Sequence, residues 1–181
     1  MMRLPSFKYV APRTVAEAAD LLAAAAGEAM LVAGGTDLLP NMKRRQQVPP
    51  MLIGLRQVDE LKSVTAGEGL TIGAGVTLTR LLRHDELRAD YAGLWQALAQ
   101  IATPHLRNMG TIGGNICLDT RCHYYDQSAD WRKAIGYCMK KEGDTCWVAT
   151  SSPKCLAVSS TDSAPALLAL GATVTLVSAE G

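Results

Sequence analysis

Two short glycine-rich loops constrain this 181-residue chain more than any other feature of its sequence. The first loop is VAGGTDLL at residues 32–39, and the second is NMGTIGGN at residues 108–115. Paired glycines let a backbone approach a ligand closely, and successive N–H groups can then form a nest for an anion. A tight turn is the simpler interpretation of either loop alone. Two such loops in one small domain could hold the two phosphates of a dinucleotide.

Neither loop fits a more familiar phosphate-binding motif. The chain has no Gly-x-x-x-x-Gly-Lys-Ser/Thr sequence, which argues against a P-loop nucleotidase. The run GAG at residues 73–75 lacks the third glycine of a Rossmann fingerprint. The residues alone therefore indicate a candidate phosphate cradle and nothing more specific.

The apolar periodicity predicts an α+β chain in two lobes. Residues 1–55 are predicted to form a small strand–helix–strand lobe, in which Thr14 and Glu17 form a capping-box pattern at the start of the helix. Residues 56–181 are predicted to form the second lobe, which includes residues 118–158, a stretch without clear periodicity. The expected helices are 14–26, 77–82, 90–102 and 163–170, and the expected strands are 29–33, 51–53, 70–74 and 172–177.

The composition excludes several classes of protein. Eighteen basic and seventeen acidic side chains leave a net charge of +1, so nothing suggests a nucleic-acid partner. No segment is long and apolar enough to span a bilayer, and residues 1–10 lack the apolar region of a signal peptide. We therefore expect a cytoplasmic protein. The chain ends directly after a predicted strand, which indicates that a further segment of the domain, or a partner segment, is missing.

Five cysteines fall within 39 residues, at positions 117, 122, 138, 146 and 155. None belongs to a Cys-x-x-Cys pair, which argues against a zinc ribbon, a thioredoxin-like site and c-type haem attachment. Because a long irregular segment needs something to order it, metal–thiolate bonds to an iron–sulfur cluster or zinc are the favoured interpretation. Unpaired buried cysteines and disulfides stay open as alternatives. The spacing does not tell which of the five would be left out.

Four motifs in a fixed order resemble the flavin-binding (medium or β) subunits of the xanthine oxidase and carbon monoxide dehydrogenase family of molybdenum hydroxylases. The motifs are AGGTDLLP at 33–40, IGAGVTL at 72–78, GTIGGN at 110–115, and Asp162 before APALLALGA at 164–172. The resemblance covers nearly the whole chain. It implies the two-lobed FAD-binding fold shared with vanillyl-alcohol oxidase and p-cresol methylhydroxylase, carrying a cysteine-rich loop insertion and without the C-terminal domain of the family.

The resemblance also implies which residues hold FAD. The first loop would bind the pyrophosphate through backbone amides, the second loop would hold the phosphates and the flavin side, and Asp162 would contact the ribityl chain or the adenosine part. Asp162 and Asp37 could also be helix N-caps. The implied cofactor-binding residues are Val32, Ala33, Gly34, Gly35, Thr36, Asp37, Leu38, Leu39, Thr111, Gly114, Asn115 and Asp162.

The cysteine-rich segment resembles an insertion in the β subunits of 4-hydroxybenzoyl-CoA reductases that binds a 4Fe–4S cluster. The matching runs are DTRC at 119–122, YDQS at 125–128, WR at 131–132, GYC at 136–138, GDTC at 143–146 and KC at 154–155. The resemblance implies that the cluster ligands are Cys122, Cys138, Cys146 and Cys155. Cys117 matches no ligand, and we expect it to be a small buried residue near the flavin.

Electron transfer is the function that the resemblance implies, in a 4-hydroxybenzoyl-CoA reductase of aromatic degradation. The chain would pass electrons between a one-electron carrier such as ferredoxin, the 4Fe–4S cluster, FAD and the 2Fe–2S clusters of a partner subunit, while a molybdenum-cofactor subunit reacts with the substrate. No residue of this chain is then expected to be catalytic, and its three histidines are expected at the surface, in packing or in loops. The alternatives are the flavin subunit of another xanthine-dehydrogenase-like hydroxylase of unknown substrate, and a zinc-stabilised scaffold domain without redox activity.

Overall fold

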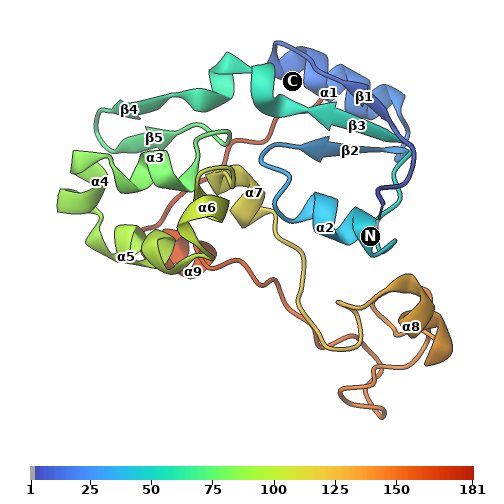
Figure 1. Ribbon diagram of the computed structural model, residues 1–181. Helices are drawn as coiled ribbons and strands as arrows, with labels where there is room; N and C mark the ends of the chain where they lie inside the picture. Colours follow the sequence, from blue (N-terminus) through green and yellow to red (C-terminus); the bar gives the residue numbers. More distant parts are fainter. Residues whose placement is uncertain (1–2) are drawn as a thin grey trace. The chain divides into compact units, whose positions relative to one another are not determined.

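The computed structural model describes residues 3–181, which form two compact units that are each discontinuous in sequence (Figure 1). The first unit contains residues 3–5, Asp37–Val48 and Leu118–Ser160. The second unit contains Ser6–Thr36, Pro49–Cys117 and Thr161–Gly181. The lobe boundary predicted after residue 55 falls inside the second unit and stays a prediction.

A parallel sheet of three strands begins the second unit. Strand β1 (Lys8–Val10) pairs with β3 (Met51–Gly54), and β3 pairs with β2 (Ala29–Val32), in the order β1-β3-β2. Helix α1 (Val15–Ala24) connects β1 to β2 and packs against β2 and β3. Because parallel strands end at the same edge of a sheet, the segments that follow β2 and β3 leave side by side, where ligands commonly bind in such sheets.

The predicted capping of α1 is confirmed in part. The Thr14 hydroxyl accepts a hydrogen bond from the Glu17 N–H at 3.1 Å. The Glu17 carboxylate accepts instead from the N–H of Arg13 at 2.8 Å, one residue before the cap, so half of the capping box forms. Buried Ala18 of α1 packs against Ile53 of the sheet and closes this small core.

The rest of the second unit is a hairpin and a set of short helices. Strands β4 (Val64–Ala66) and β5 (Leu70–Ile72) form the antiparallel hairpin. Two 3₁₀ turns, Leu55–Gln57 and Asp59–Lys62, precede it. The helices are α3 (Leu78–Leu82), α4 (Asp85–Asp90), α5 (Ala92–Gln100), α6 (Pro104–Arg107), α7 (Ile112–Ile116) and α9 (Ala164–Ala169). Their buried core is Val76, Leu78, Leu81, Leu87, Leu94, Leu98, Ile101 and Ile112.

The first unit has little regular structure. It contains α2 (Leu38–Lys43) and α8 (Ala129–Ala134), and the remainder consists of turns and irregular segments. This agrees with the lack of periodicity across residues 118–158. Ion pairs link the two cap residues of α2, Asp37 and Arg44, to Arg121 and Asp126 of the same unit.

Two sequence predictions need correction. The predicted strand at 172–177 is wrong, because this segment has no partner strand among residues 3–181 and its backbone is irregular there. Its apolar side chains are exposed, Val174 by 63% and Leu176 by 86%. The mixture of helices and strands is confirmed, but the strand–helix–strand unit is parallel, so the fold is mixed α/β and not purely α+β. No helix within the described residues is long and apolar enough to cross a membrane.

Candidate cofactor-binding sites

A cavity of about 240 Å³ in the second unit brings the two glycine-rich loops together. Ala33 and Gly34, directly after β2, form one wall, and Leu55 and Arg56, directly after β3, form another. The second loop supplies further lining, and so does the segment before α3. The remaining lining residues are Lys62, Gly75, Val76, Thr77, Arg80, Asn108, Met109 and Thr111.

Gly34 is the point where the two loops touch. A Cβ atom at this position would lie 2.0 Å from the carbonyl oxygen of Met109, so no side chain fits without moving the backbone of the second loop. Gly35 has a φ of +70°, in the left-handed region that favours glycine. The first loop therefore needs both glycines, one for space and one for conformation.

The second loop is held by the segment that precedes α3. The N–H of Leu78 donates to the Gly110 carbonyl at 2.9 Å, and the N–H of Ile112 donates to the Val76 carbonyl at 3.0 Å. These bonds lie on either side of an antiparallel bridge between Thr77 and Thr111. The two threonines form a non-hydrogen-bonded pair, so their own N–H groups point away from the partner segment. Thr77 and Thr111 both line the cavity, so their backbone amides are candidates for binding a ligand.

Three basic side chains line the cavity and no acidic side chain does. Arg80 is held in place by its Nη1, which donates to the Lys62 carbonyl at 2.7 Å. Lys62 also pairs with Asp59 at 2.7 Å, and this bond keeps the pKa of the Asp59 carboxyl below its ordinary value. Arg56 completes the set. Sequence reasoning missed all three, although Arg56 lies two residues beyond a strand at the edge where ligands bind.

Asn115 makes hydrogen bonds within the fold and does not line the cavity. Its buried Oδ1 accepts hydrogen bonds from the Thr161 hydroxyl at 3.0 Å and from the N–H and hydroxyl of Ser163, at 3.1 and 2.6 Å. These bonds tie α7 to the start of α9. Asp162 is exposed, and the N-cap position of α9 belongs to Ser163, so the N-cap alternative for Asp162 is wrong by one residue. The cofactor contacts predicted for Asn115 and Asp162 stay predictions.

Asp37, the sixth residue of the first loop, belongs to the first unit with Leu38 and Leu39. It occupies the N-cap position of α2 but its side chain makes no capping bond. Its carboxylate accepts a hydrogen bond from Asn41 Nδ2 at 3.1 Å and forms an ion pair with Arg121. Of the predicted cofactor residues, the cavity thus brings together Ala33, Gly34 and Thr111, and the remaining predicted positions do not line it.

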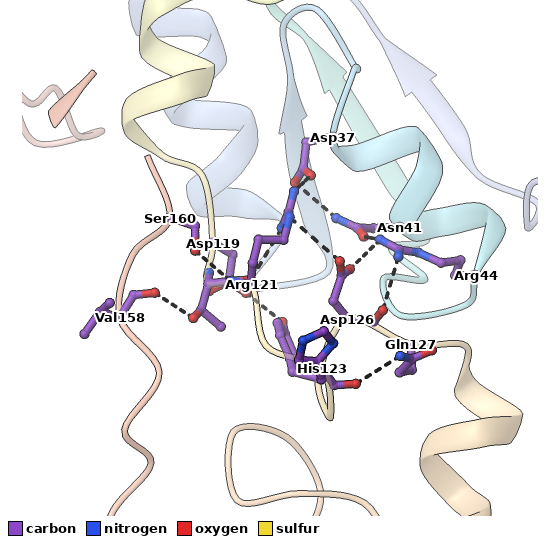
Figure 2. A network of polar contacts seen from close by, with 12 residues as sticks. Asp37, Asn41, Arg44, Asp119, Arg121, His123, Asp126, Gln127, Val158 and Ser160 are labelled. Carbon is purple, nitrogen blue, oxygen red and sulfur yellow. Dashed lines mark hydrogen bonds and ion pairs between the residues drawn. The ribbon is translucent and has the colours of Figure 1, made fainter. Parts of the chain in front are cut away.

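A network of alternating charges joins α2 to the segment that begins the cysteine-rich region (Figure 2). Arg121 pairs with Asp37, and its Nε lies 3.9 Å from Asp126. Asp126 pairs in turn with Arg44 at 2.6 Å. Arg44 also donates to Asn41, which returns the network to α2. Asn41 of α2 and the two cap residues of that helix, Asp37 and Arg44, are therefore linked to the residues on either side of Cys122 within one unit.

The four predicted cluster ligands line one small cavity in the first unit. Cys138 and Cys146 are buried, whereas Cys122 and Cys155 are partly exposed, and all four are free thiols. The other lining residues are aromatic or aliphatic except for one cation, Lys140, which pairs with Asp119 at 3.1 Å; they are Tyr124, Tyr125, Met139, Lys140, Trp147, Val148 and Ala157. Across residues 3–181, no three or more His, Cys, Asp or Glu side chains are arranged to hold a metal ion. The ligand role of the four cysteines stays a prediction.

Backbone N–H groups point at two of these sulfur atoms. The amides of Ala149 and Leu156 hold the pKa of the Cys146 thiol below its ordinary value by hydrogen bonding, against the effect of burial. The N–H of Ala157 donates to Cys155 Sγ at 3.4 Å. Donors to sulfur favour the thiolate, the form that binds metals and clusters.

Cys117 stands apart from this group. It lies in the second unit, at the end of α7, and it is exposed, so the expectation of a small buried residue is wrong. The three histidines behave as expected. His105 and His123 are exposed, and His84 is partly buried at the start of α4.

Glycine loops that meet at the carboxyl edge of parallel strands, beside basic side chains, are typical of a domain that binds a phosphate-bearing cofactor. Comparison with known families gives the particular family. The family described as "FAD binding domain in molybdopterin dehydrogenase" matches residues 5–181. The chain belongs to this family, and it is an FAD-binding domain of the molybdenum hydroxylase type of oxidoreductase.

Several known proteins are similar to this chain. The aldehyde oxidoreductase FAD-binding subunit PaoB of Escherichia coli (strain K12) is 37% identical over 185 residues, covering 98% of this chain and 58% of that subunit. The carbon monoxide dehydrogenase medium chain of Hydrogenophaga pseudoflava is 40% identical over 113 residues, covering 62% of this chain and 39% of that one. The chain thus spans less than two thirds of the length of these relatives.

Solved structures agree with the family assignment. Carbon monoxide dehydrogenase from Hydrogenophaga pseudoflava matches with a TM-score of 0.62 and 40% identity, over 64% of this chain and 40% of that chain. Quinoline 2-oxidoreductase from Pseudomonas putida 86 matches with a TM-score of 0.62 and 35% identity, over 66% of this chain and 42% of that chain. The match to PaoB covers 98% of this chain, so the aligned range includes residues 118–160.

Proposed function

We propose that the protein is the electron-transfer flavoprotein subunit of a molybdenum-containing oxidoreductase. The observation that carries this proposal is the cavity in which both glycine-rich loops meet beside Arg56, Lys62 and Arg80. Bound FAD would supply chemistry that protein side chains lack, since it exchanges either one or two electrons. The two-lobed arrangement of the vanillyl-alcohol oxidase type is part of the proposal, because the family resemblance implies it.

The cavity fits the diphosphate of FAD on physical grounds. The close approach at Gly34 leaves backbone, and no side chain, where the two loops meet. The amides of Thr77 and Thr111 lie outside their bridge and can donate to phosphate oxygens. The three basic side chains offset the negative charge of the diphosphate, although their exposure limits the strength of each contact.

We also propose that Cys122, Cys138, Cys146 and Cys155 hold a 4Fe–4S cluster, which would carry single electrons. Three observations support it: the four cysteines line one cavity, backbone amides donate to two of the sulfur atoms, and apolar side chains form much of the wall. A cytoplasmic location, part of the same proposal, is compatible with five free thiols. A zinc-stabilised site would use the same cysteines, and metal and acid-labile sulfide analysis separates the two.

The substrate and the partners follow from the same proposal. A molybdenum-cofactor subunit would react with the substrate, a 2Fe–2S subunit would link it to this flavin domain, and a one-electron carrier such as ferredoxin would exchange electrons with the complex. The relative whose match spans the cysteine-rich segment is named an aldehyde oxidoreductase subunit, which favours an aldehyde as substrate. The second candidate, 4-hydroxybenzoyl-CoA, rests on the motif resemblance of that segment alone, since no relative described above carries that name.

A pair of glycine substitutions tests flavin binding. In Gly34→Ala the added methyl group meets the Met109 carbonyl, and we expect FAD to be lost from the purified protein. Gly93→Ala is the matched control, because a Cβ at Gly93, in α5, meets no atom within 4 Å. Flavin absorbance and released FAD per chain are measured for both variants, and circular dichroism confirms that both are folded. Equal FAD content in a folded Gly34→Ala variant would contradict the proposed site.

A further inference from the structure

The cysteine-rich unit buries one arginine almost completely. Arg132, on α8, is 1% exposed and is the largest fully buried side chain of the described residues. Burying a guanidinium away from water is costly unless other groups compensate the charge. A buried arginine is therefore unexpected in a unit with so little regular structure.

The compensation of the Arg132 charge is incomplete. Nη2 donates to the Lys141 carbonyl at 2.8 Å and lies 3.6 Å from the Glu142 carboxylate, which is itself half exposed. The guanidinium stands 5.8 Å from the ring centre of Tyr125 and 5.5 Å from that of Tyr137, within the range of cation–π attraction. Its Nε has no hydrogen-bond partner among residues 3–181.

Arg132 makes hydrogen bonds on both sides of the turn that contains Cys138. The carbonyl of Arg132 accepts from the N–H of Tyr137 at 2.7 Å, and the guanidinium binds the Lys141 carbonyl. The turn is strained, because Tyr137 and Glu142 have φ values of +64° and +69° in the left-handed region. Such strain persists only where neighbouring contacts enforce it.

The same arginine reaches the cysteine cavity through its aromatic neighbour. Tyr125, which stacks on Arg132, is one of the residues that line the cavity with the four cysteines. The guanidinium therefore lies next to a ring that belongs to the cavity wall. An arginine guanidinium in a protein carries a positive charge.

We propose that Arg132 is a positioning residue for the iron–sulfur cluster, which holds the Cys138 turn in place and sets a buried positive charge beside the cluster. This inference rests on the proposed cluster. Reduction adds one negative charge to a cluster, and a nearby cation in a poorly hydrated environment stabilises the reduced form. Arg132 thereby raises the reduction potential of the cluster and does not itself react.

Two substitutions separate the charge from the packing. Arg132→Met keeps a long side chain and removes the charge, whereas Arg132→Lys keeps the charge and removes the planar fork. Lys133→Met is the matched control, since Lys133 is the next residue of α8 and is exposed. The proteins are purified anaerobically with their partner subunits, and the cluster potential is measured by redox titration monitored by electron paramagnetic resonance. Iron and acid-labile sulfide are counted in parallel.

We expect Arg132→Met to shift the cluster potential to a more negative value, while Arg132→Lys and Lys133→Met stay near wild type. If Arg132→Met loses its iron, Arg132→Lys should retain it. An unchanged potential in a cluster-loaded Arg132→Met variant would overturn the inference. Loss of iron from both Arg132 variants would overturn the proposed effect of charge, because the guanidinium would then serve only to hold the Cys138 turn. Wild-type protein without iron and sulfide would instead refute the proposed cluster itself.

Discussion

The two cavities of this protein are lined by different kinds of residue. The cavity of the second unit lies where glycine loops meet at the edge of a parallel sheet, beside three basic side chains, and it is braced by the bonds of residues 74–78 to the second loop. The cavity of the first unit is lined by four cysteines, their aromatic neighbours and Lys140, on irregular segments. A site where glycine loops meet fails when a Cβ is added, whereas a site of cysteine side chains fails when a functional group is removed.

Different interactions stabilise the two sites. Hydrogen bonds of sheet and hairpin order the backbone around the glycine loops. The first unit has two short helices, and charged side chains join its segments instead, through Asp37, Arg121, Asp126 and Arg44 (Figure 2). We therefore expect substitutions in one unit to leave the ligand of the other unit bound.

The largest expected effect that tests this separation is the loss of the cluster in Cys138→Ser. Cys138 is buried and lines the cavity, so its removal leaves three thiolates for the cluster. Iron and sulfide should fall to background while the FAD content stays at the wild-type level. Cys117→Ser, in the second unit, is the control and should keep both cofactors. Full iron content in Cys138→Ser would remove this residue from the ligand set.

A smaller effect is expected when basic side chains of the cavity in the second unit are neutralised. Lys62→Gln with Arg80→Gln should weaken FAD binding by about fivefold per charge or less, because partly exposed ion pairs contribute up to about 1 kcal/mol each. Titration of the flavin-free protein with FAD gives the Kd, and raising the salt concentration should narrow the difference from wild type. The same Kd for wild type and the double variant at low salt would show that these cations do not face the diphosphate.

The charge network of the first unit should contribute a modest amount to its stability. Arg121→Gln removes the ion pairs with Asp37 and Asp126, and we expect a loss of about 1 kcal/mol in the free energy of unfolding, since each pair is partly exposed. Urea denaturation is followed by tryptophan fluorescence in a Trp95→Phe background, so that the signal comes from Trp131 and Trp147 of this unit. The same substitution at exposed Arg83, in the second unit, is the control. A loss no larger than in the control would mean that the network is not stabilising.

The smallest expected effect is a pH dependence that involves Asp119. Burial acts to raise the pKa of this carboxyl, but hydrogen bonds from Tyr125, the Thr120 amide and Lys140 outweigh it and keep the pKa below its ordinary value. A group with a depressed folded pKa stabilises the protein above its unfolded pKa, and this stability is lost as the pH falls through the folded value. Denaturation midpoints between about pH 6 and about pH 3 should fall less steeply in Asp119→Asn than in wild type. Parallel curves would exclude this contribution.

Local signals explain what the sequence could predict. The helix at α1 has a capping residue and an alanine-rich run, and the strands β2 and β3 are apolar runs bounded by glycine or proline, so short-range chemistry is enough to place them. The grouping of the four cysteines came from the resemblance of their flanking motifs, because their spacing alone left the choice among five open.

Long-range contacts explain what the sequence could not predict. Arg56, Lys62 and Arg80 converge because the ends of β3, the turn before β4 and α3 meet in space, and no local pattern encodes that meeting. The alternation at residues 172–177 predicts a strand, yet a strand needs a partner, and local periodicity cannot tell whether one is present. The burial of Arg132 could not be foreseen either, since charged side chains are almost always exposed unless paired.

We propose one protein that holds two cofactors in two differently built cavities. The most direct test is the visible spectrum of anaerobically purified protein, combined with a count of FAD, iron, acid-labile sulfide and zinc per chain. We predict flavin absorbance together with about four iron and about four sulfide per chain, and bleaching of both cofactors on reduction. Zinc without sulfide would contradict the cluster, and protein that binds no FAD even when FAD is added in excess would contradict the proposed flavin site.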